Sequence, residues 1–122
     1  MPRILLVEDE DSLRHVLGLT LRKMGHEVIE AANGHEALQL CLVEPPDVVL
    51  TDLVMPDKEG LETIQEIREL QPDIKIIAMS GGGRVNATDY LSIARKMGAA
   101  HTLEKPFSNE ALAAAIRSVS SS

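Results

Sequence analysis

The chain has 122 residues, of which 44% are hydrophobic and 25% are charged, and this is the composition of one globular domain with a buried core. Its formal charge of −7, with one Tyr, one Phe and no Trp, excludes a nucleic acid surface built on clustered basic residues or aromatic stacking. The single cysteine excludes an internal disulfide and no long apolar run is present, so we expect a cytoplasmic domain without a membrane partner, with Cys41 in its core.

Short apolar stretches alternate with stretches of helical periodicity, and glycine, proline and capping residues mark the helix ends. In chain order, the first predicted elements are a strand at 3–7, a helix capped by Asp11 or Ser12 and ended by Gly25, a strand at 27–31, and a helix capped by Asn33 and stopped by Pro45. They are followed by a strand at 47–51, a helix through Leu61, Ile64 and Ile67, and a strand at 75–79. The last three elements are a helix from Tyr90 to Met97 closed by Gly98, a strand at 101–104 and a helix capped by Ser108. The first, third and fourth strands are almost continuously apolar, which is typical of parallel strands covered on both faces. The second strand alternates and is expected at an edge.

This alternation predicts an α/β fold of the (βα)5 type, in which right-handed crossovers place helices on both faces of a five-stranded parallel sheet. Neither a linker nor an internal repeat interrupts the pattern. We therefore expect residues 1–122 to form a single domain, with a frayed tail over 118–122 and no effector domain in this chain. Such a domain either stands alone or has been separated from a neighbour.

Polar residues follow the ends of four predicted strands. Glu8 and Asp9 follow the first strand, Asp52 the third, Ser80 the fourth and Lys105 the fifth. Ligands of open α/β sheets bind beyond the carboxyl ends of the strands, at this edge. If the first and third strands are neighbours, about 4.8 Å apart, Asp9 and Asp52 lie side by side and repel by roughly 4 kcal/mol. A shared proton, a cation or the ammonium of Lys105 must offset this repulsion.

The combination suits the transfer of a phosphoryl group onto Asp52. Oxygen-rich acidic groups in an open crevice suit Mg²⁺, which leaves coordination positions for a phosphate, while Lys105 and Ser80 supply an ammonium and a hydroxyl. Taken singly, each residue has a simpler interpretation as a turn, capping or surface residue, and for Glu10 and Asp11 a solvated helix start is favoured. The joint placement on four strand ends favours the functional interpretation.

Four segments resemble the receiver domain of two-component response regulators, over essentially the full length of the chain. They are ILLVEDED at 4–11, DVVLTDLVMPDKEGLE at 47–62, IIAMSG at 76–81 and LEKPF at 103–107. The resemblance, which is to single-domain receivers of the chemotaxis type, implies a flavodoxin-like sheet of order 2-1-3-4-5.

The resemblance also implies a reaction. Asp52 would accept a phosphoryl group from a phosphohistidine of a sensor histidine kinase or a histidine phosphotransfer protein. Lys105, ahead of a cis peptide bond to Pro106, would contact the phosphoryl oxygens, and Ser80 would move to hydrogen-bond them. The domain would thus be a signalling phosphoacceptor rather than an enzyme, acting through a downstream protein target or an effector domain outside this chain.

A magnesium site is implied in the same way. Asp9, Asp52 and the backbone carbonyl of Val54 would ligate Mg²⁺, with Glu8 acting largely through water. Oxygen ligands of this kind are those that Mg²⁺ prefers.

Three features depart from the family pattern. Thr102 stands where the family usually has the Tyr or Phe that moves with the hydroxyl of the fourth strand, so we expect an altered readout. Val54 and Gly82 offer no polar side chain to orient a water that would hydrolyse the acyl phosphate. The interval between the hydroxyl and the lysine is a few residues longer than usual, which predicts a long loop at GGGRVNAT, 81–88. This glycine-rich stretch lacks the spacing of a nucleotide-binding loop and is interpreted as a hinge.

Three alternatives remain open at this point. A phosphatase of the haloacid dehalogenase type also uses a strand-end Asp with Mg²⁺, although it usually needs a second Asp where Val54 stands. A flavodoxin-like cofactor binder would have few aromatic residues to hold a flavin. A pseudo-receiver that switches weakly, or a phosphate sink, is compatible with Thr102.

Overall fold

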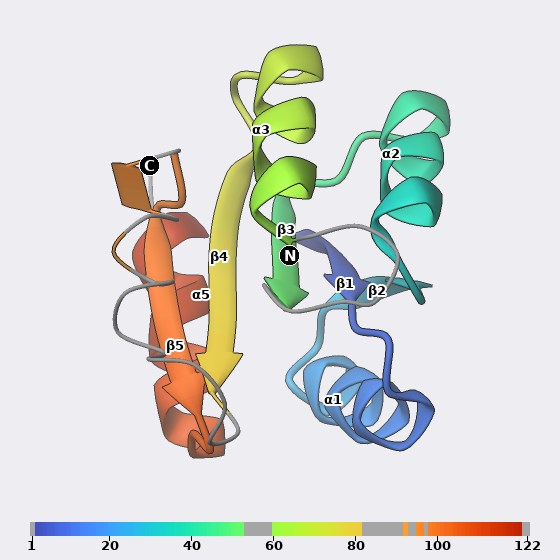
Figure 1. Cartoon of the computed structure of the whole chain (residues 1–122). Coiled ribbons are helices and arrows are strands. Elements are labelled where there is room, and N and C mark those ends of the chain that lie inside the picture. The colour runs from blue at the N-terminus through green and yellow to red at the C-terminus, as the bar shows by residue number, and fades with distance from the viewer. Residues whose placement is uncertain (1, 53–59, 82–91, 93–94, 97, 121–122) are drawn as a thin grey trace.

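The computed structural model describes residues 2–52, 60–81, 92, 95, 96 and 98–120, in which strands and helices alternate from β1 to β4 and β5 is followed by α5 (Figure 1). Their bounds are β1 (Arg3–Val7), α1 (Asp11–Lys23), β2 (Glu27–Ala31), α2 (Gly34–Val43), β3 (Val48–Asp52), α3 (Gly60–Leu70), β4 (Lys75–Gly81), β5 (His101–Lys105) and α5 (Asn109–Ser120). The predicted strands agree with these bounds to within about two residues, which is the usual uncertainty of an element end.

The strands form one parallel sheet of order β2-β1-β3-β4-β5, which confirms the predicted fold and places β2 at an edge. Val7 at the end of β1 lies opposite Ala31 of β2 and Thr51 of β3. At the other side of the sheet, Lys105 of β5 lies opposite Gly81 of β4. The carboxyl ends of β1, β3, β4 and β5 therefore meet along one edge, where the polar residues follow the strands.

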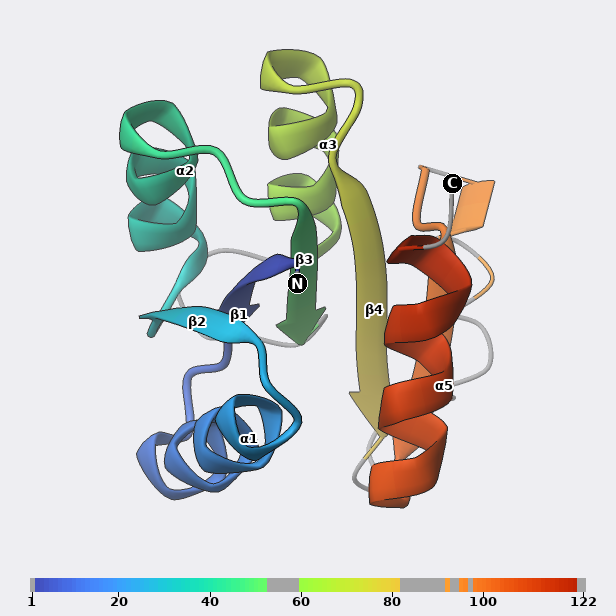
Figure 2. The same cartoon turned by 180° about the vertical axis from the view of Figure 1, so that it is seen from behind.

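The sheet separates two apolar layers, because successive side chains of a strand point to opposite faces. The layer against α2 and α3 includes Leu5, Val7, Val49, Ile76, Ala78, Ala37, Cys41, Ile64 and Ile67. The layer against α1 and α5 includes Ile4, Leu6, Leu50, Ile77, Met79, Leu17, Leu21, Leu112 and Ile116. In Figure 1, α5 lies behind β4 and β5, and in Figure 2 it lies in front of them. Coverage on both faces explains why the central strands are apolar at nearly every position.

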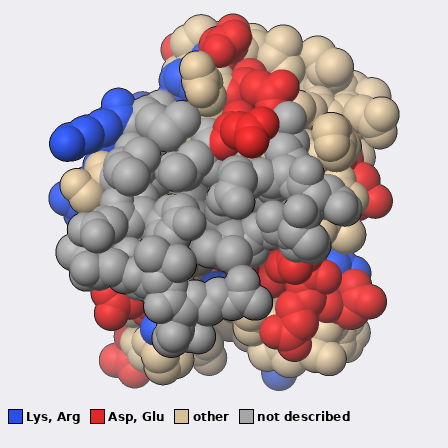
Figure 3. Space-filling model, in the orientation of Figure 1, with Lys and Arg blue, Asp and Glu red and all other residues tan. Residues whose placement is uncertain are grey.

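Three expectations from the composition concern the cysteine, the surface charge and membrane-spanning helices. Cys41 is buried, as predicted, and burial raises the pKa of its thiol to about 11, so that it remains an uncharged core residue. Acidic side chains gather in several patches on the face drawn in Figure 3, in keeping with the formal charge of −7. None of the helices in the described part of the chain is long and apolar enough to cross a membrane.

Among the described residues, the predicted caps of α2 and α5 are confirmed, whereas that of α1 is not. Asn33 caps α2 by accepting a hydrogen bond from the backbone N–H of Glu36, and the Ser108 hydroxyl accepts one from the N–H of Ala111 ahead of α5. The predicted cap of α1 at Asp11 or Ser12 is wrong. Glu10 occupies the N-cap position without a capping hydrogen bond from its side chain, and the Asp11 carboxylate accepts a hydrogen bond from Arg14.

The carboxyl-terminal end is more ordered than predicted. Helix α5 continues to Ser120, so the expectation of a frayed tail from residue 118 is wrong for residues 118–120. Val119 is only 7% exposed and packs in the layer against α1 and α5, and this contact holds the last turn.

Several predictions lie outside the described residues. They are the carbonyl of Val54, the helix from Tyr90 to Met97 and the glycine loop from Gly82 onward. Gly98, which was predicted to close that helix, has a φ of 116°, a conformation that favours glycine.

Candidate functional site

The structure brings the strand-end residues together at one edge of the sheet. Glu8 and Asp9 follow β1, Asp52 ends β3, Ser80 lies next to the end of β4 and Lys105 ends β5. Glu8, Asp52 and Ser80 are 1%, 7% and 2% exposed, whereas Asp9 is not buried. The edge thus forms a crevice in which charged groups are partly withdrawn from water.

Three carboxylates crowd this crevice. One oxygen each from Glu8, Asp9 and Asp52 lies within 4.8 Å of the other two. Burial, and next the charge of Asp52, raise the pKa of Glu8 to about 7, although the ammonium of Lys105 acts in the opposite direction. The negative charge is therefore only partly compensated by the protein itself.

Lys105 links the two sides of the site. Its Nζ donates hydrogen bonds to Oδ2 of Asp52 at 2.8 Å and to Oε1 of Glu8 at 3.0 Å. The flexible stem carries the ammonium back from β5 past β4, as the sequence predicted. Burial opposes the charge of Lys105, but the hydrogen bonds and charges of Asp52 and Glu8 outweigh it and raise the pKa of the ammonium. Lys105 is therefore a permanent cation at neutral pH.

The donor set fits Mg²⁺. The ammonium of Lys105 pairs with two of the three clustered carboxylates, those of Glu8 and Asp52, so negative charge remains for a cation to neutralise. Hard carboxylate oxygens are the ligands that Mg²⁺ prefers, and a site with few protein ligands leaves positions for water and phosphate oxygens.

Ser80 and Thr102 occupy neighbouring strands behind this cluster. Ser80 lies on β4 opposite Glu104, one position before the pair of Gly81 and Lys105. Thr102 lies opposite Ala78, and its Oγ1 is 3.4 Å from Nη2 of Arg95, a long hydrogen bond. Thr102 is therefore joined to the segment that precedes β5.

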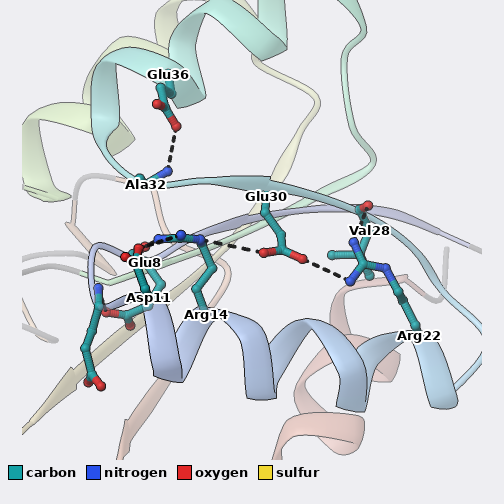
Figure 4. A network of polar contacts seen from close by, with 9 residues as sticks. Glu8, Asp11, Arg14, Arg22, Val28, Glu30, Ala32 and Glu36 are labelled. Atoms are coloured by element: carbon teal, nitrogen blue, oxygen red, sulfur yellow. Dashed lines mark hydrogen bonds and ion pairs between the residues drawn. The ribbon is translucent and has the colours of Figure 1, made fainter.

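Arg14 in α1 was not anticipated from the sequence. Its Nη1 donates a 2.8 Å hydrogen bond to the backbone carbonyl of Glu8, and its Nη2 lies 2.6 Å from Oδ1 of Asp11 (Figure 4). The only signal in the sequence is an arginine in the first helical turn after an acidic pair. That signal does not say where the guanidinium points.

A groove lies between α1 and the start of α5, and it adjoins the crevice. It has a volume of about 450 Å³ and is lined by Leu13, Val16, Leu17, Thr20, Lys105, Pro106, Phe107 and Asn109. The Lys105–Pro106 peptide bond is cis, as predicted. Val16 is 57% exposed, so the groove presents apolar surface beside the charged site.

The model of the family described as "Response regulator receiver domain" matches residues 4–117. The chain belongs to the response regulator receiver domain family. Receiver domains bind Mg²⁺ in an acidic pocket and interact with histidine kinases or phosphotransfer proteins, and the carboxylates of Glu8, Asp9 and Asp52 form an acidic group that could hold a metal ion.

Relatives of this receiver domain include proteins of two sizes. It is 39% identical over 117 residues to "Probable transcriptional regulator ycf27" of Cyanophora paradoxa, covering 96% of this chain and 47% of that protein. It is 30% identical over 115 residues to "Sporulation initiation phosphotransferase F" of Bacillus subtilis (strain 168), covering 94% of this chain and 90% of that protein. The receiver domain thus spans about half the length of the first relative and most of the second.

A solved structure supports the same fold. The chemotaxis protein CheY4 of Vibrio cholerae superposes with a TM-score of 0.87 at 29% sequence identity, covering 98% of both chains. The receiver fold predicted from the sequence is confirmed by this similarity and by the strand order.

Proposed function

We propose that this receiver domain is a phosphorylation-operated signalling module in which Asp52 accepts a phosphoryl group. The observation that carries the proposal is the ammonium of Lys105, which bridges Asp52 and Glu8 in a partly buried crevice next to Asp9. An ion pair of this kind places a permanent cation beside the nucleophile, where negative charge arrives with the phosphoryl group.

The chemistry follows from the positions of three side chains. An Oδ atom of Asp52 attacks the phosphorus of a phosphohistidine, the O–P bond forms, the P–N bond breaks, and its electron pair returns to the imidazole nitrogen. Lys105 then pairs with the phosphoryl oxygens, since the carboxylate charge of Asp52 has been used in the new bond. The Ser80 hydroxyl donates a hydrogen bond to one of these oxygens.

The proposed magnesium site uses Asp9, Asp52 and the carbonyl of Val54, with Glu8 acting through water. Val54 lies outside the described residues, and the proposal for it rests on the family resemblance alone. When bound, Mg²⁺ would neutralise charge on the phosphoryl oxygens.

The donor is proposed to be a histidine kinase or a histidine phosphotransfer protein of the cytoplasm. Its histidine must approach Asp52 beside Lys105, and the apolar groove between α1 and α5 opens at that lysine. An apolar groove next to a charged reaction site suits a protein surface better than a small ion. We therefore place the contact with the donor at this groove.

Thr102 favours one variant of this function. A threonine is smaller than an aromatic ring and is joined by a long hydrogen bond to Arg95, so its movement would change the surface of β5 less. A receiver of this kind switches weakly or serves as a phosphate sink, with the same chemistry at Asp52.

The proposal is tested by labelling with acetyl phosphate in the presence of Mg²⁺. Asp52→Asn is expected to abolish the aspartyl phosphate, because the amide is a poor nucleophile, whereas the exposed control Asp47→Asn retains it. A label of unchanged stoichiometry on Asp52→Asn would overturn the assignment. A kinase donor extends the assay to the groove, because Val16→Glu should slow transfer from the kinase and leave labelling by acetyl phosphate unchanged. Equal rates from both donors would remove the groove from the proposal.

A further inference from the structure

The backbone of Glu8 is held from two sides at the point where β1 ends. Its N–H donates to the carbonyl of Ala31 at 3.0 Å, which extends the ladder between β1 and β2 by one bond. In a regular parallel ladder, the carbonyl of Glu8 would next accept from the N–H of Asn33. Asn33 lies beyond the end of β2, at the N-cap of α2, and its N–H makes no such bond among the described residues, so a buried carbonyl is left for another donor to satisfy.

Arg14 supplies that donor. Its guanidinium reaches from α1 to the Glu8 carbonyl at 2.8 Å, and its side chain is only 18% exposed. Charged donors to backbone carbonyls form short, directional bonds. The end of β1 is thus fixed by β2 through one group of Glu8 and by α1 through the other.

Two carboxylates hold the guanidinium: Asp11 of α1, at 2.6 Å from Nη2, and Glu30 of β2, which forms a longer ion pair. Oε1 of Glu30 lies 3.6 Å from Nε of Arg14, and its Oε2 accepts a 2.9 Å hydrogen bond from Nη1 of Arg22 (Figure 4). A Cβ atom on Gly18 would lie 2.8 Å from that same Oε2. The glycine in the middle of α1 therefore makes room for the Glu30 carboxylate between the two arginines.

We infer that Arg14 is a positioning residue for the magnesium site: anchored by Glu30, it holds the Glu8 carbonyl and so sets the direction in which the side chains of Glu8 and Asp9 leave the backbone. The inference rests on the proposed function, because it concerns the same carboxylates. Arg14 touches neither the carboxylate of Asp52 nor the ammonium of Lys105 in any contact of the described residues, so its action is through the backbone.

The direction in which the Mg²⁺ affinity changes when Arg14 is replaced distinguishes a positioning role from an effect of its charge. Arg14 is a cation near an acidic site, and removing it would strengthen the attraction of Mg²⁺ if charge alone mattered. Loss of the backbone contact has the opposite effect, because Glu8 and Asp9 are then free to leave the geometry that the metal requires. Residues that orient metal ligands typically contribute about 10-fold or more to metal affinity.

The test is a Mg²⁺ titration of the full ¹⁵N-labelled chain, followed by amide shifts. Arg14→Met is expected to raise the Kd for Mg²⁺ about 10-fold. Arg22→Met is the matched control, because it removes the other guanidinium from Glu30 without touching Glu8, and we expect a change of less than about twofold. Arg14→Lys keeps the charge and the stem but cannot reach all three acceptors, and its Kd should fall between those of the unmodified chain and Arg14→Met.

Four outcomes decide the inference. Weaker binding by Arg14→Met, with Arg22→Met unchanged, supports it. An unchanged or tighter Kd in a folded Arg14→Met overturns it, and so does an equal loss in both variants. If Arg14→Met does not fold, Arg14→Lys is decisive, and a Kd equal to that of the unmodified chain overturns the inference. If the unmodified chain itself fails to bind Mg²⁺, the proposed function falls and the inference falls with it.

Discussion

At the amino ends and at the carboxyl ends of the strands, one basic side chain is paired with two carboxylates, but the exposure of these side chains differs. At the amino ends of the strands, Arg3 lies 3.1 Å from a carboxylate oxygen of Glu27 and 3.1 Å from one of Glu44. These three side chains are 33%, 62% and 52% exposed. At the carboxyl ends, the side chain of Lys105 is 20% exposed, and its two carboxylate partners are 2% and 10% exposed.

The comparison shows that burial, rather than the number of charges, makes one cluster responsive. The hydrogen bond that Arg3 donates to the carboxylate of Glu27 raises the pKa of Arg3, but an arginine is protonated at any ordinary pH, so nothing changes at the surface. In the crevice, burial and next the charge of Asp52 raise the pKa of Glu8 to about 7. The same kinds of side chain are therefore inert at one edge and poised to exchange protons and cations at the other.

The largest expected effect is the pH dependence of stability that arises from Glu8. Its pKa is about 7 in the fold and about 4.5 when the chain is unfolded, so between these values the folded state binds more protons. Its contribution to the free energy of unfolding therefore falls as the pH rises from about 4.5 to about 7, by roughly 3 kcal/mol.

The measurement compares urea unfolding of the unmodified chain and of Glu8→Gln across this range of pH. As the pH rises, the free energy of unfolding of the unmodified chain should fall relative to that of Glu8→Gln. Saturating Mg²⁺ should reduce this shift, because a bound cation stabilises the carboxylate. A difference that stays constant from pH 5 to pH 8 would contradict the assignment to Glu8.

A smaller effect is expected for Lys105→Met. Loss of the ammonium leaves the buried carboxylates of Glu8 and Asp52 facing each other, which would destabilise the fold by about 2 kcal/mol at neutral pH. The loss is limited because Glu8 can bind a proton. Chemical unfolding without Mg²⁺ measures it, and added Mg²⁺ should restore much of the stability. Labelling of Asp52 by acetyl phosphate should remain possible, with a weaker structural response. Stability equal to that of the unmodified chain would show that the ammonium does not compensate these charges.

The smallest effect is expected for Arg3→Met, the surface counterpart of Lys105→Met. Exposed ion pairs contribute little because water and salt screen them. Unfolding should change only slightly and without dependence on Mg²⁺, and the slight change should vanish at high salt. A loss of stability as large as that of Lys105→Met would contradict the conclusion that the exposed cluster contributes less than the buried one.

Much of the architecture could be predicted from the sequence because it depends on local periodicity. Continuous apolar runs marked β1, β3 and β4, and the alternating run marked β2 as an edge strand. The site residues could be located because a strand end is a position along the chain. Asp52 and Lys105, though 53 residues apart, were both expected at the crevice, and their side chains meet there at 2.8 Å.

Other features depend on how far a side chain reaches across an interface. The bond from Arg14 to the Glu8 carbonyl depends on how α1 packs on β2, and on the space that Gly18 leaves for Glu30. The last turn of α5 looked frayed because its sequence is rich in serine, yet the burial of Val119 holds it in place.

The sequence by itself determined the alternation of elements, the family, and which polar residues end the strands, because these follow from the order of residue types along the chain. Only the tertiary structure decided which carboxylates are buried, that the pKa of Glu8 lies at about 7, and which arginine holds the end of β1. These properties depend on desolvation and on distances between elements, and neither is encoded in any local stretch.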